Sequence, residues 1–295
     1  MPDPTASQRD MGPILVATDR TTEGEAAFRA AAQLAAKVRS TVRVVVVVEP
    51  LPVIVPDPSV MTEPLVASPE LLDKVRDRVV AQMRAVAPEG LEWHVEVESG
   101  RPSDEIVNKA HDLKAKLIVI ELVHHNVVDR FLDGDTALEV VRRSRAPVLL
   151  VSAGWKALPK LAVFAVDFSP QSMEAARAGV RLLADGSTVV LVHVRSVVTV
   201  YDGMAMWEEE YDTAAAKELG KFTEALNVPS GIRVETVMLS GNPSSAILDF
   251  ANGRDADLIV SGTRGAGLIE RLVVGSVATR LMRHSTGSLL IVPEL

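Results

Sequence analysis

Hydrophobic positions along the chain alternate between short continuous runs and stretches with helical periodicity. Runs such as Val44–Val48 and Leu258–Val260 are uniformly apolar, which is typical of strands covered on both faces. Between the runs lie stretches such as Gly24–Lys37 and Asp212–Leu226, where apolar side chains recur at helical spacing. This alternation predicts βαβ units around a parallel sheet. We expect strands at 13–18, 42–48, 92–97, 116–121 and 147–151, and again at 160–166, 188–194, 232–238, 257–261 and 288–292.

The second half of the chain repeats the first. Residues 115–151 match residues 256–292 without a gap, at an offset of 141 positions. Residues 100–103 and 241–244 match at the same offset. Because this repeat is far longer than the unit of a solenoid, we expect two tandem domains.

The repeat also gives the expected domain boundaries. Near the start of each half, the segment ILVATD at 14–19 matches AVFAVD at 162–167. We expect domain 1 over 13–152 and domain 2 over 160–295, after a flexible tail at 1–12. The tail is polar and lacks the apolar core of a signal peptide.

Composition restricts the classes of function. The 295 residues include no cysteine, which excludes disulfides, thiolate metal sites and cysteine catalysis. The net charge is −8 and no basic run stands out, so we expect no nucleic-acid partner. The longest uniformly aliphatic run, Val44–Val48, is far shorter than a membrane span. We therefore expect a cytoplasmic protein without a membrane partner.

A glycine-rich loop in the second half carries the most specific signal. Gly262 and Gly265 follow an apolar run, and Gly275 and Ser276 stand just before a helical pattern at 277–284. Glycine lets the backbone approach an anion closely or adopt a positive φ. The amides and the dipole of a helix N-terminus favour negative charge. The segment therefore predicts a phosphate-binding loop, and its alternative is a structural turn that belongs to the fold.

The motifs of the second half resemble those of the universal stress protein family in its tandem form. They are the spacing G-x-x-G-x9-G-[ST], a first strand that ends in Asp, and a last strand of the kind GSLLIV. The resemblance implies two Rossmann-like, doubly wound α/β domains, each with a five-stranded, mainly parallel sheet in the order 3-2-1-4-5. It also implies a stress-response protein that binds ATP where the glycine motif is complete.

The resemblance assigns roles to residues of the second half. It places the adenine against Val166 and Val194, Asp167 beside the ribose or a bound Mg²⁺, and Arg264 along the phosphates. The residues themselves leave alternatives, because Asp167 can cap the following helix and Arg264 can be a solvated loop residue. The full set assigned to the nucleotide is Ala165, Val166, Asp167, Val194, Ser261, Gly262, Arg264, Gly265, Gly275, Ser276 and Val277.

The first half lacks this chemistry. Glu121, His124 and Asp135 replace the first two glycines and the serine of the motif, and only Gly134 survives. A carboxylate about 4 Å from a phosphate charge costs roughly 4 kcal/mol at an effective dielectric constant near 20. We predict no ATP site in this half, although Asp19 is retained.

The histidines do not predict a metal centre. His124 and His125 lie near Glu121 and Asp129, but adjacent histidines on a loop rarely converge on one ion. A polar surface loop is therefore the preferred interpretation. His193 lies within an apolar strand, where we expect a core histidine with satisfied hydrogen bonds.

The motif leads to one main hypothesis of function and two alternatives. The main hypothesis is a regulator that binds one ATP in domain 2 and responds through a conformational change or a choice of partner. The first alternative is a slow ATPase or autophosphorylating enzyme with Ser276 as the acceptor, although no convincing general base accompanies the motif. The second alternative is a scaffold that binds no nucleotide.

Two kinds of segment favour association. The final strands at 148–151 and 289–292 are short and apolar, and unprotected edge strands of this kind pair. The connections at 50–69 and 196–206 are long and apolar, and they suit either a lid or a packing surface. We expect the two domains to form a pseudo-dimer within the chain, and two chains can then form a homodimer.

Overall fold

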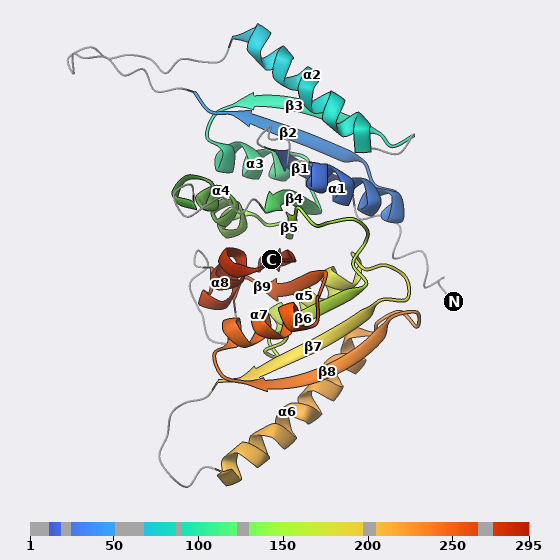
Figure 1. Cartoon of the computed structure of the whole chain (residues 1–295), viewed down its shortest axis with the longest axis vertical. Coiled ribbons are helices and arrows are strands. Elements are labelled where there is room, and N and C mark those ends of the chain that lie inside the picture. The colour runs from blue at the N-terminus through green and yellow to red at the C-terminus, as the bar shows by residue number, and fades with distance from the viewer. Residues whose placement is uncertain are drawn as a thin grey trace, which may run out of the picture. The chain divides into compact units, whose positions relative to one another are not determined.

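The computed structural model describes residues 12–18, 25–50, 68–86, 90–122, 130–196, 205–264 and 274–294. Contacts divide the chain into two compact units, Met1–Ala146 and Pro147–Leu295. In Figure 1 the first unit runs from blue to green and the second from green to red. The predicted tail at 1–12 lies outside the described residues except for Gly12, and most of the two long connections also lies outside them. No helix among the described residues is long and apolar enough to cross a membrane.

The first unit is a parallel sheet with the strand order β3-β2-β1-β4. Its two inner strands are buried almost throughout and consist mainly of valine, isoleucine and leucine, which explains their continuous apolar pattern. The strands are β1 (Ile14–Thr18), β2 (Val42–Val48), β3 (Trp93–Ser99) and β4 (Leu117–Leu122), and the helices are α1 (Glu25–Val38), α2 (Pro69–Val86), α3 (Pro102–Asp112) and α4 (Arg130–Arg143).

Helices cover both faces of this first sheet. Because successive side chains alternate across a strand, Trp93 and Glu96 of β3 point to opposite faces. The ring of Phe28 in α1 packs edge-on against Trp93, with 6.2 Å between the ring centroids. Lys109 of α3 pairs with Glu96 at 2.6 Å between Nζ and Oε2. The unit is therefore doubly wound, as the sequence predicts.

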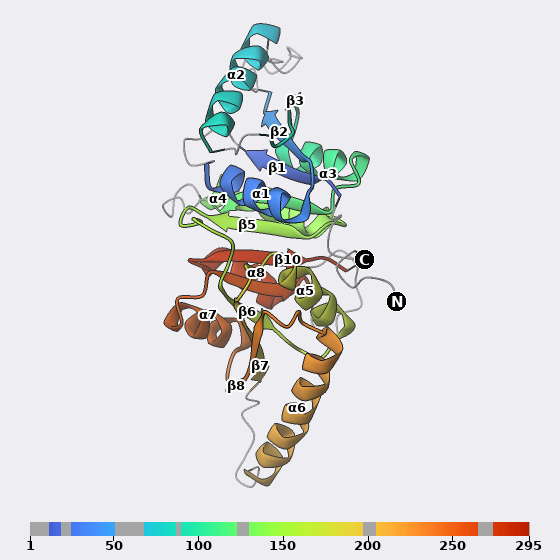
Figure 2. The same ribbon diagram turned by 90° about the vertical axis from the view of Figure 1, so that its right-hand side faces the viewer.

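The second unit contains a sheet with the order β5-β10-β9-β6-β7-β8. Strands β6 to β10 pair in parallel, and their arrangement is the predicted order 3-2-1-4-5, which is confirmed. Figure 2 shows α6 and α7 on opposite sides of β7 and β8. The strands are β5 (Val148–Ser152), β6 (Leu161–Ala165), β7 (Thr188–Arg195), β8 (Arg233–Ser240), β9 (Leu258–Gly262) and β10 (Ser288–Val292), and the helices are α5 (Pro170–Val180), α6 (Ala205–Leu226), α7 (Pro243–Gly253) and α8 (Ser276–His284).

Contacts group β5, the last strand of the first repeat, with the second unit. Among the described residues the first unit contains four strands and the second contains six, because β5 belongs to the second. β5 pairs antiparallel with β10, and Leu149 lies opposite Leu290. The backbone N–H of Ser152 also donates to Ser288 Oγ at 3.1 Å. The sequence predicts that these two apolar final strands pair, and β5 and β10 do pair.

The two repeats differ in how equivalent helices begin. Proline occupies the first turn of both α3 and α7, a position that requires no N–H donor. Asn242 caps α7, since its side-chain oxygen accepts from the N–H of Ser245 at 3.2 Å. Arg101 at the same position of α3 makes no side-chain cap. Both observations confirm what the residue types predict.

The caps give a matched test of stability. We expect Asn242→Ala to lower the free energy of unfolding by about 1 kcal/mol, because the first turn of α7 loses an acceptor for its amide. Arg101→Ala removes no cap and should change it by less than about 0.5 kcal/mol. Urea denaturation followed by circular dichroism measures both values. Equal losses in the two variants would show that the cap of Asn242 does not stabilise the protein.

Candidate functional site

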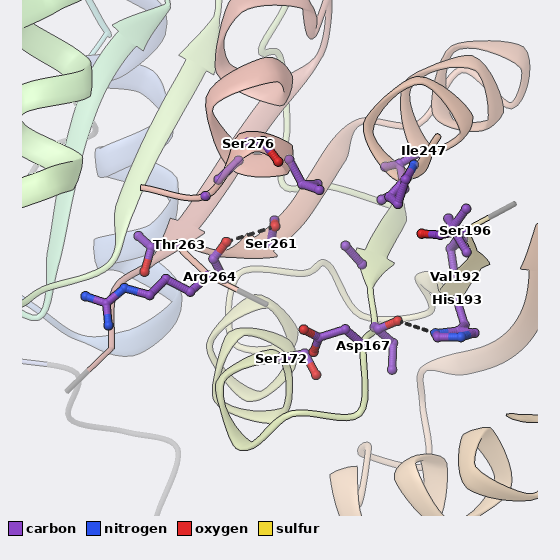
Figure 3. Close-up of a pocket in the computed structure, with 18 residues that line it drawn as sticks. Asp167, Ser172, Val192, His193, Ser196, Ile247, Ser261, Thr263, Arg264 and Ser276 are labelled. Atoms are coloured by element: carbon purple, nitrogen blue, oxygen red, sulfur yellow. Dashed lines mark hydrogen bonds between the residues drawn. The ribbon is translucent and has the colours of Figure 1, made fainter. Parts of the chain in front are cut away.

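A cavity of about 330 Å³ opens at the carboxyl ends of strands in the second unit. It lies where the strand order reverses, between β6 and β9, which is the usual ligand site of an open α/β sheet. Figure 3 shows side chains from β6, β7, β9, α7 and α8 gathered around it. Its lining residues are Ala165, Val166, Asp167, Ser172, Val192, His193, Val194, Ser196, Pro243, Ile247, Ser261, Gly262, Thr263, Arg264, Gly275, Ser276, Val277 and Ala278.

The structure brings nearly all of the predicted nucleotide residues together around this cavity. Every one of them lines it except Gly265, which lies outside the described residues. The cavity also includes residues that the sequence did not single out for it, of which His193 and Ile247 come from β7 and α7. Neither residue belongs to the glycine motif. Only the strand register and the position of α7 therefore show that they line the cavity.

The N-terminus of α8 faces the cavity without a side-chain cap. Gly275 is the N-cap residue, with φ −62° and ψ 157°, and the first turn contains no acidic residue. The N–H groups of Ser276, Val277 and Ala278 are first-turn amides that have no intrahelical partner. In contrast, side-chain oxygens cap both α5 and α7 in the same unit. The first turn of α8 therefore favours an anion over a neutral ligand.

Gly275 has a structural role at this turn. Its N–H donates to the carbonyl of Thr263 at 2.7 Å, and the N–H of Thr263 donates to the carbonyl of Val292 at 2.9 Å. The Gly275 amide is thus already used within the chain, so the amides that face an anion begin at Ser276. These two bonds tie the start of α8 to the ends of β9 and β10.

Gly262 provides space for a neighbouring side chain. A Cβ atom placed on Gly262 would lie 2.7 Å from Cγ of Gln171, which is closer than real Cβ contacts allow. Gln171 cannot easily move away, because its Nε2 donates to the carbonyl of Val292 at 2.7 Å. Neither Gly262 nor Gly275 has a positive φ, so at Gly262 it is the absent Cβ that the position requires. The structural role that the sequence left open for the loop is therefore present.

Asp167 orders the turn that follows β6. Its Oδ1 accepts from the N–H of Ser169 at 3.0 Å and from the hydroxyl of Ser169 at 2.6 Å. Ser169 in turn caps α5 by accepting from the N–H of Ser172 at 3.1 Å. The cap is thus Ser169 and not Asp167, which corrects the capping alternative. Phe168 between them has φ +64°, a conformation that costs energy for a bulky residue and occurs often at functional sites.

His193 connects the floor of the cavity to α6. It is 6% exposed, and its Nδ1 lies 2.8 Å from the carbonyl oxygen of Val166. Because a carbonyl only accepts, Nδ1 carries the proton and donates. In the neutral ring Nε2 then accepts from the hydroxyl of Tyr211, at 2.8 Å. His193 is the satisfied core histidine that the sequence predicts, and it lines the cavity as well.

Comparison with known proteins identifies the family. The sequence profile of the Universal stress protein family matches residues 11–152 and again residues 160–293. The chain belongs to this family. It is 31% identical over 146 residues to a universal stress protein of Methanocaldococcus jannaschii, covering 46% of this chain and 84% of that one. It is also 31% identical over 134 residues to a universal stress protein of Thermus aquaticus, covering 45% and 98%.

Solved structures of full tandem length have the same fold. A universal stress protein from Archaeoglobus fulgidus matches with a TM-score of 0.63 and 19% identity, covering 96% of each chain. A protein of unknown function from Pseudomonas aeruginosa matches with a TM-score of 0.66 and 15% identity, covering 98% of this chain and 94% of that one. The tandem two-domain form of the family is therefore shown for this chain.

Within this universal stress protein, Arg264 is not a solvated loop residue. Its side chain is 11% exposed and forms an ion pair with the exposed Glu294. Figure 3 shows the side chain running away from Asp167 and His193. The positive charge is thus fixed at one side of the cavity by a carboxylate from the end of the chain.

The first universal-stress repeat builds the equivalent helix differently. α4 begins at Arg130, five residues before Asp135, the position that matches Ser276. Gly134 therefore lies inside the helix, whereas its counterpart Gly275 is an N-cap. Amides after the first four residues of a helix are bonded within it. Asp19 and His124 lie outside the described residues.

The contact between Gly262 and Gln171 can be tested by a double substitution. We expect Gly262→Ala to lower the free energy of unfolding by about 1–3 kcal/mol, because the added methyl overpacks the site. Gln171→Ala in the same chain should recover much of this loss, since it removes the clashing Cγ. Gly220→Ala is the control, because an added Cβ there meets nothing within 4 Å. Additive losses in the double variant, measured by urea denaturation, would contradict the contact.

Proposed function

We propose that this universal stress protein is a regulator that binds one ATP molecule in its second repeat. The observation that carries the proposal is the uncapped N-terminus of α8 at a cavity lined by the residues that the family resemblance assigns to the nucleotide. The cavity of about 330 Å³ is within the size range of ligand sites. Its walls combine apolar side chains with a few convergent polar groups.

The residues present suit the parts of an adenine nucleotide. The free amides of Ser276 and Val277, with the hydroxyl of Ser276, are donors for phosphate oxygens. Apolar residues Val166, Val194 and Ile247 suit the faces of a base. Asp167 suits the ribose hydroxyls or a Mg²⁺ ion that arrives with the phosphates, since Mg²⁺ usually takes one or two protein carboxylates.

A metal ion at this site is proposed to arrive with the nucleotide. Among the described residues no group of three or more His, Asp or Glu side chains could hold an ion. Mg²⁺ bound by Asp167 and phosphate oxygens requires no such group. Mg²⁺ dependence of ATP binding is therefore part of the proposal, and Mg²⁺ binding in the absence of nucleotide is not.

The first repeat is proposed to bind no nucleotide. Its sequence replaces the motif residues by Glu121, His124 and Asp135. In addition, the early start of α4 at Arg130 places the amides after Gly134 inside the helix. Both the side chains and the backbone at this position are therefore unsuited to a phosphate.

The enzyme alternative has less support than regulation by occupancy. Asp167 is the only carboxylate among the residues that line the described cavity, and its Oδ1 already accepts two hydrogen bonds from Ser169. Both ring nitrogens of His193 are also engaged. A group that activates water or the Ser276 hydroxyl would have to exchange these partners first.

Association remains part of the proposal. Within the second unit the final strand of the first repeat, β5, pairs with the final strand of the second, β10. This pairing supports a pseudo-dimer of the repeats and uses the apolar strands that the sequence singled out. A homodimer of two chains is a separate proposal, and measuring the mass of the protein in solution tests it.

ATP binding gives the central test of function. We expect mass spectrometry to find adenine nucleotide released from freshly purified protein, and calorimetry with ATP and Mg²⁺ to give one site per chain. Ser276→Asp should weaken the affinity for ATP at least about a hundredfold, because a carboxylate about 4 Å from phosphate costs roughly 4 kcal/mol. Ser240→Asp is the control, since this exposed residue adds the same charge outside the cavity.

Four results would point elsewhere. Two ATP molecules per chain, or a Ser276→Asp variant with unchanged affinity, would rule out the proposed single site. ATP turnover well above that of Ser276→Ala would favour the enzyme. Purified protein without nucleotide and without a thermal shift in ATP and Mg²⁺ would favour the scaffold.

A further inference from the structure

Val194 lies near the carboxyl end of β7, and its backbone groups point past the end of β6. Two residues earlier, the carbonyl of Val192 accepts from the N–H of Val166 at 2.9 Å. On the other side of β7, the carbonyl of Arg195 accepts from the N–H of Gly241 at 3.0 Å. Because backbone groups alternate sides along a strand, Val194 faces the same side as Val192. In a regular parallel ladder the N–H of Val194 would donate to the carbonyl of Val166 next.

His193 occupies this acceptor instead. Its Nδ1–H donates to the carbonyl of Val166 at 2.8 Å (Figure 3), and the regular pairing of β6 with β7 ends at Ala165 and Val192. Among the described residues the N–H and C=O of Val194 therefore have no hydrogen-bond partner. Val194 lines the cavity of the proposed nucleotide site. A backbone donor and a backbone acceptor thus lie side by side at one wall of this cavity.

Two neighbouring rings hold His193 in this orientation. The ring of Phe168 lies tilted against it, with 4.4 Å between the centroids, and the ring of Tyr211 lies nearly parallel at 6.0 Å. The hydroxyl of Tyr211 lies 2.8 Å from Nε2 and donates to it in the neutral ring. This bond keeps the proton of His193 on Nδ1, where the carbonyl of Val166 requires it.

The same contact accounts for the conformation of Phe168. Its φ of +64° is unfavourable for a residue with a Cβ atom. The turn that contains it follows β6 and brings the Phe168 ring onto His193. The unfavourable backbone conformation therefore supports the ring that donates to the end of β6.

The first repeat lacks this arrangement. β2, the counterpart of β7, has the sequence VRVVVVV and contains no histidine. A valine side chain has no donor for a carbonyl beside the strand. The fold therefore forms without such a histidine, which accompanies the repeat that has the complete glycine motif.

We propose that His193 is a positioning residue for the base of the nucleotide, an inference that rests on the proposed function. By occupying the carbonyl of Val166, it keeps the N–H and C=O of Val194 open toward the cavity. An adjacent donor and acceptor match the edge of adenine, where N1 accepts and the 6-amino group donates. In hypoxanthine the two roles are exchanged, since N1 donates and O6 accepts. With the phosphates fixed at α8, the backbone of Val194 would therefore distinguish ATP from ITP.

Hydrogen exchange in nucleotide-free protein tests the position of the amide directly. By NMR, the N–H of Val194 should exchange at least about tenfold faster than that of Val192, which lies within the ladder. In His193→Leu the carbonyl of Val166 loses its donor, so the N–H of Val194 should bond to it and become protected. In His193→Asn the side-chain amide supplies a donor in place of Nδ1, so the N–H of Val194 should stay unprotected.

Calorimetry with ATP and ITP tests the contact with the base. The unaltered protein should prefer ATP at least about tenfold, because ITP leaves polar groups mismatched. His193→Leu should weaken the affinity for ATP about tenfold and remove most of this preference, whereas His193→Asn should keep both within about threefold. Tripolyphosphate, which has no base, should bind both variants within about twofold of the unaltered protein. Val190→Ala is the control, because it loosens the buried core of β7 outside the cavity and should keep the preference.

The outcomes separate this inference from the proposed function. No ATP binding to the unaltered protein would contradict the proposed function, and the exchange of the Val194 amide would still decide the role of His193. Slow exchange of that amide in the unaltered protein would overturn the role. An unchanged preference for ATP in His193→Leu would overturn it as well. Equal losses for ATP and tripolyphosphate in His193→Leu, or lost preference in Val190→Ala, would show a structural role only.

Discussion

The first turn of α8 has backbone amides that no side chain caps, and its place in the unit follows from strand pairing. Gly275 donates to Thr263 at the end of β9, and Thr263 donates to Val292 at the end of β10. Since β9 also pairs with β6, the turn is held at the point where the strand order reverses. Asp167 and His193 reach the same point from β6 and β7. The cavity therefore depends on where these amides are fixed more than on any single side chain.

The family resemblance predicted the order of β6 to β10 and most of the cavity residues, and it could be seen in the sequence because strand ends and glycine motifs are local patterns. Of the two reasons given for the glycines, positive φ is wrong for Gly262 and Gly275, whereas close approach to an anion stays a prediction. The sequence could not predict the contact of Gln171 with Gly262 or the ion pair of Arg264 with Glu294, because each joins segments far apart in the chain.

The comparison of α4 with α8 separates two ways in which a binding site can be lost. Asp135 is the counterpart of Ser276 in the first repeat, and its charge would by itself repel phosphate. The early start of α4 at Arg130 is a change of backbone, which leaves Gly134 within the helix although glycine there costs about 0.5–1 kcal/mol. Restoring glycine and serine to the first repeat would thus leave its amides bonded within the helix. Side-chain identity and helix start must both be correct for this turn to accept an anion.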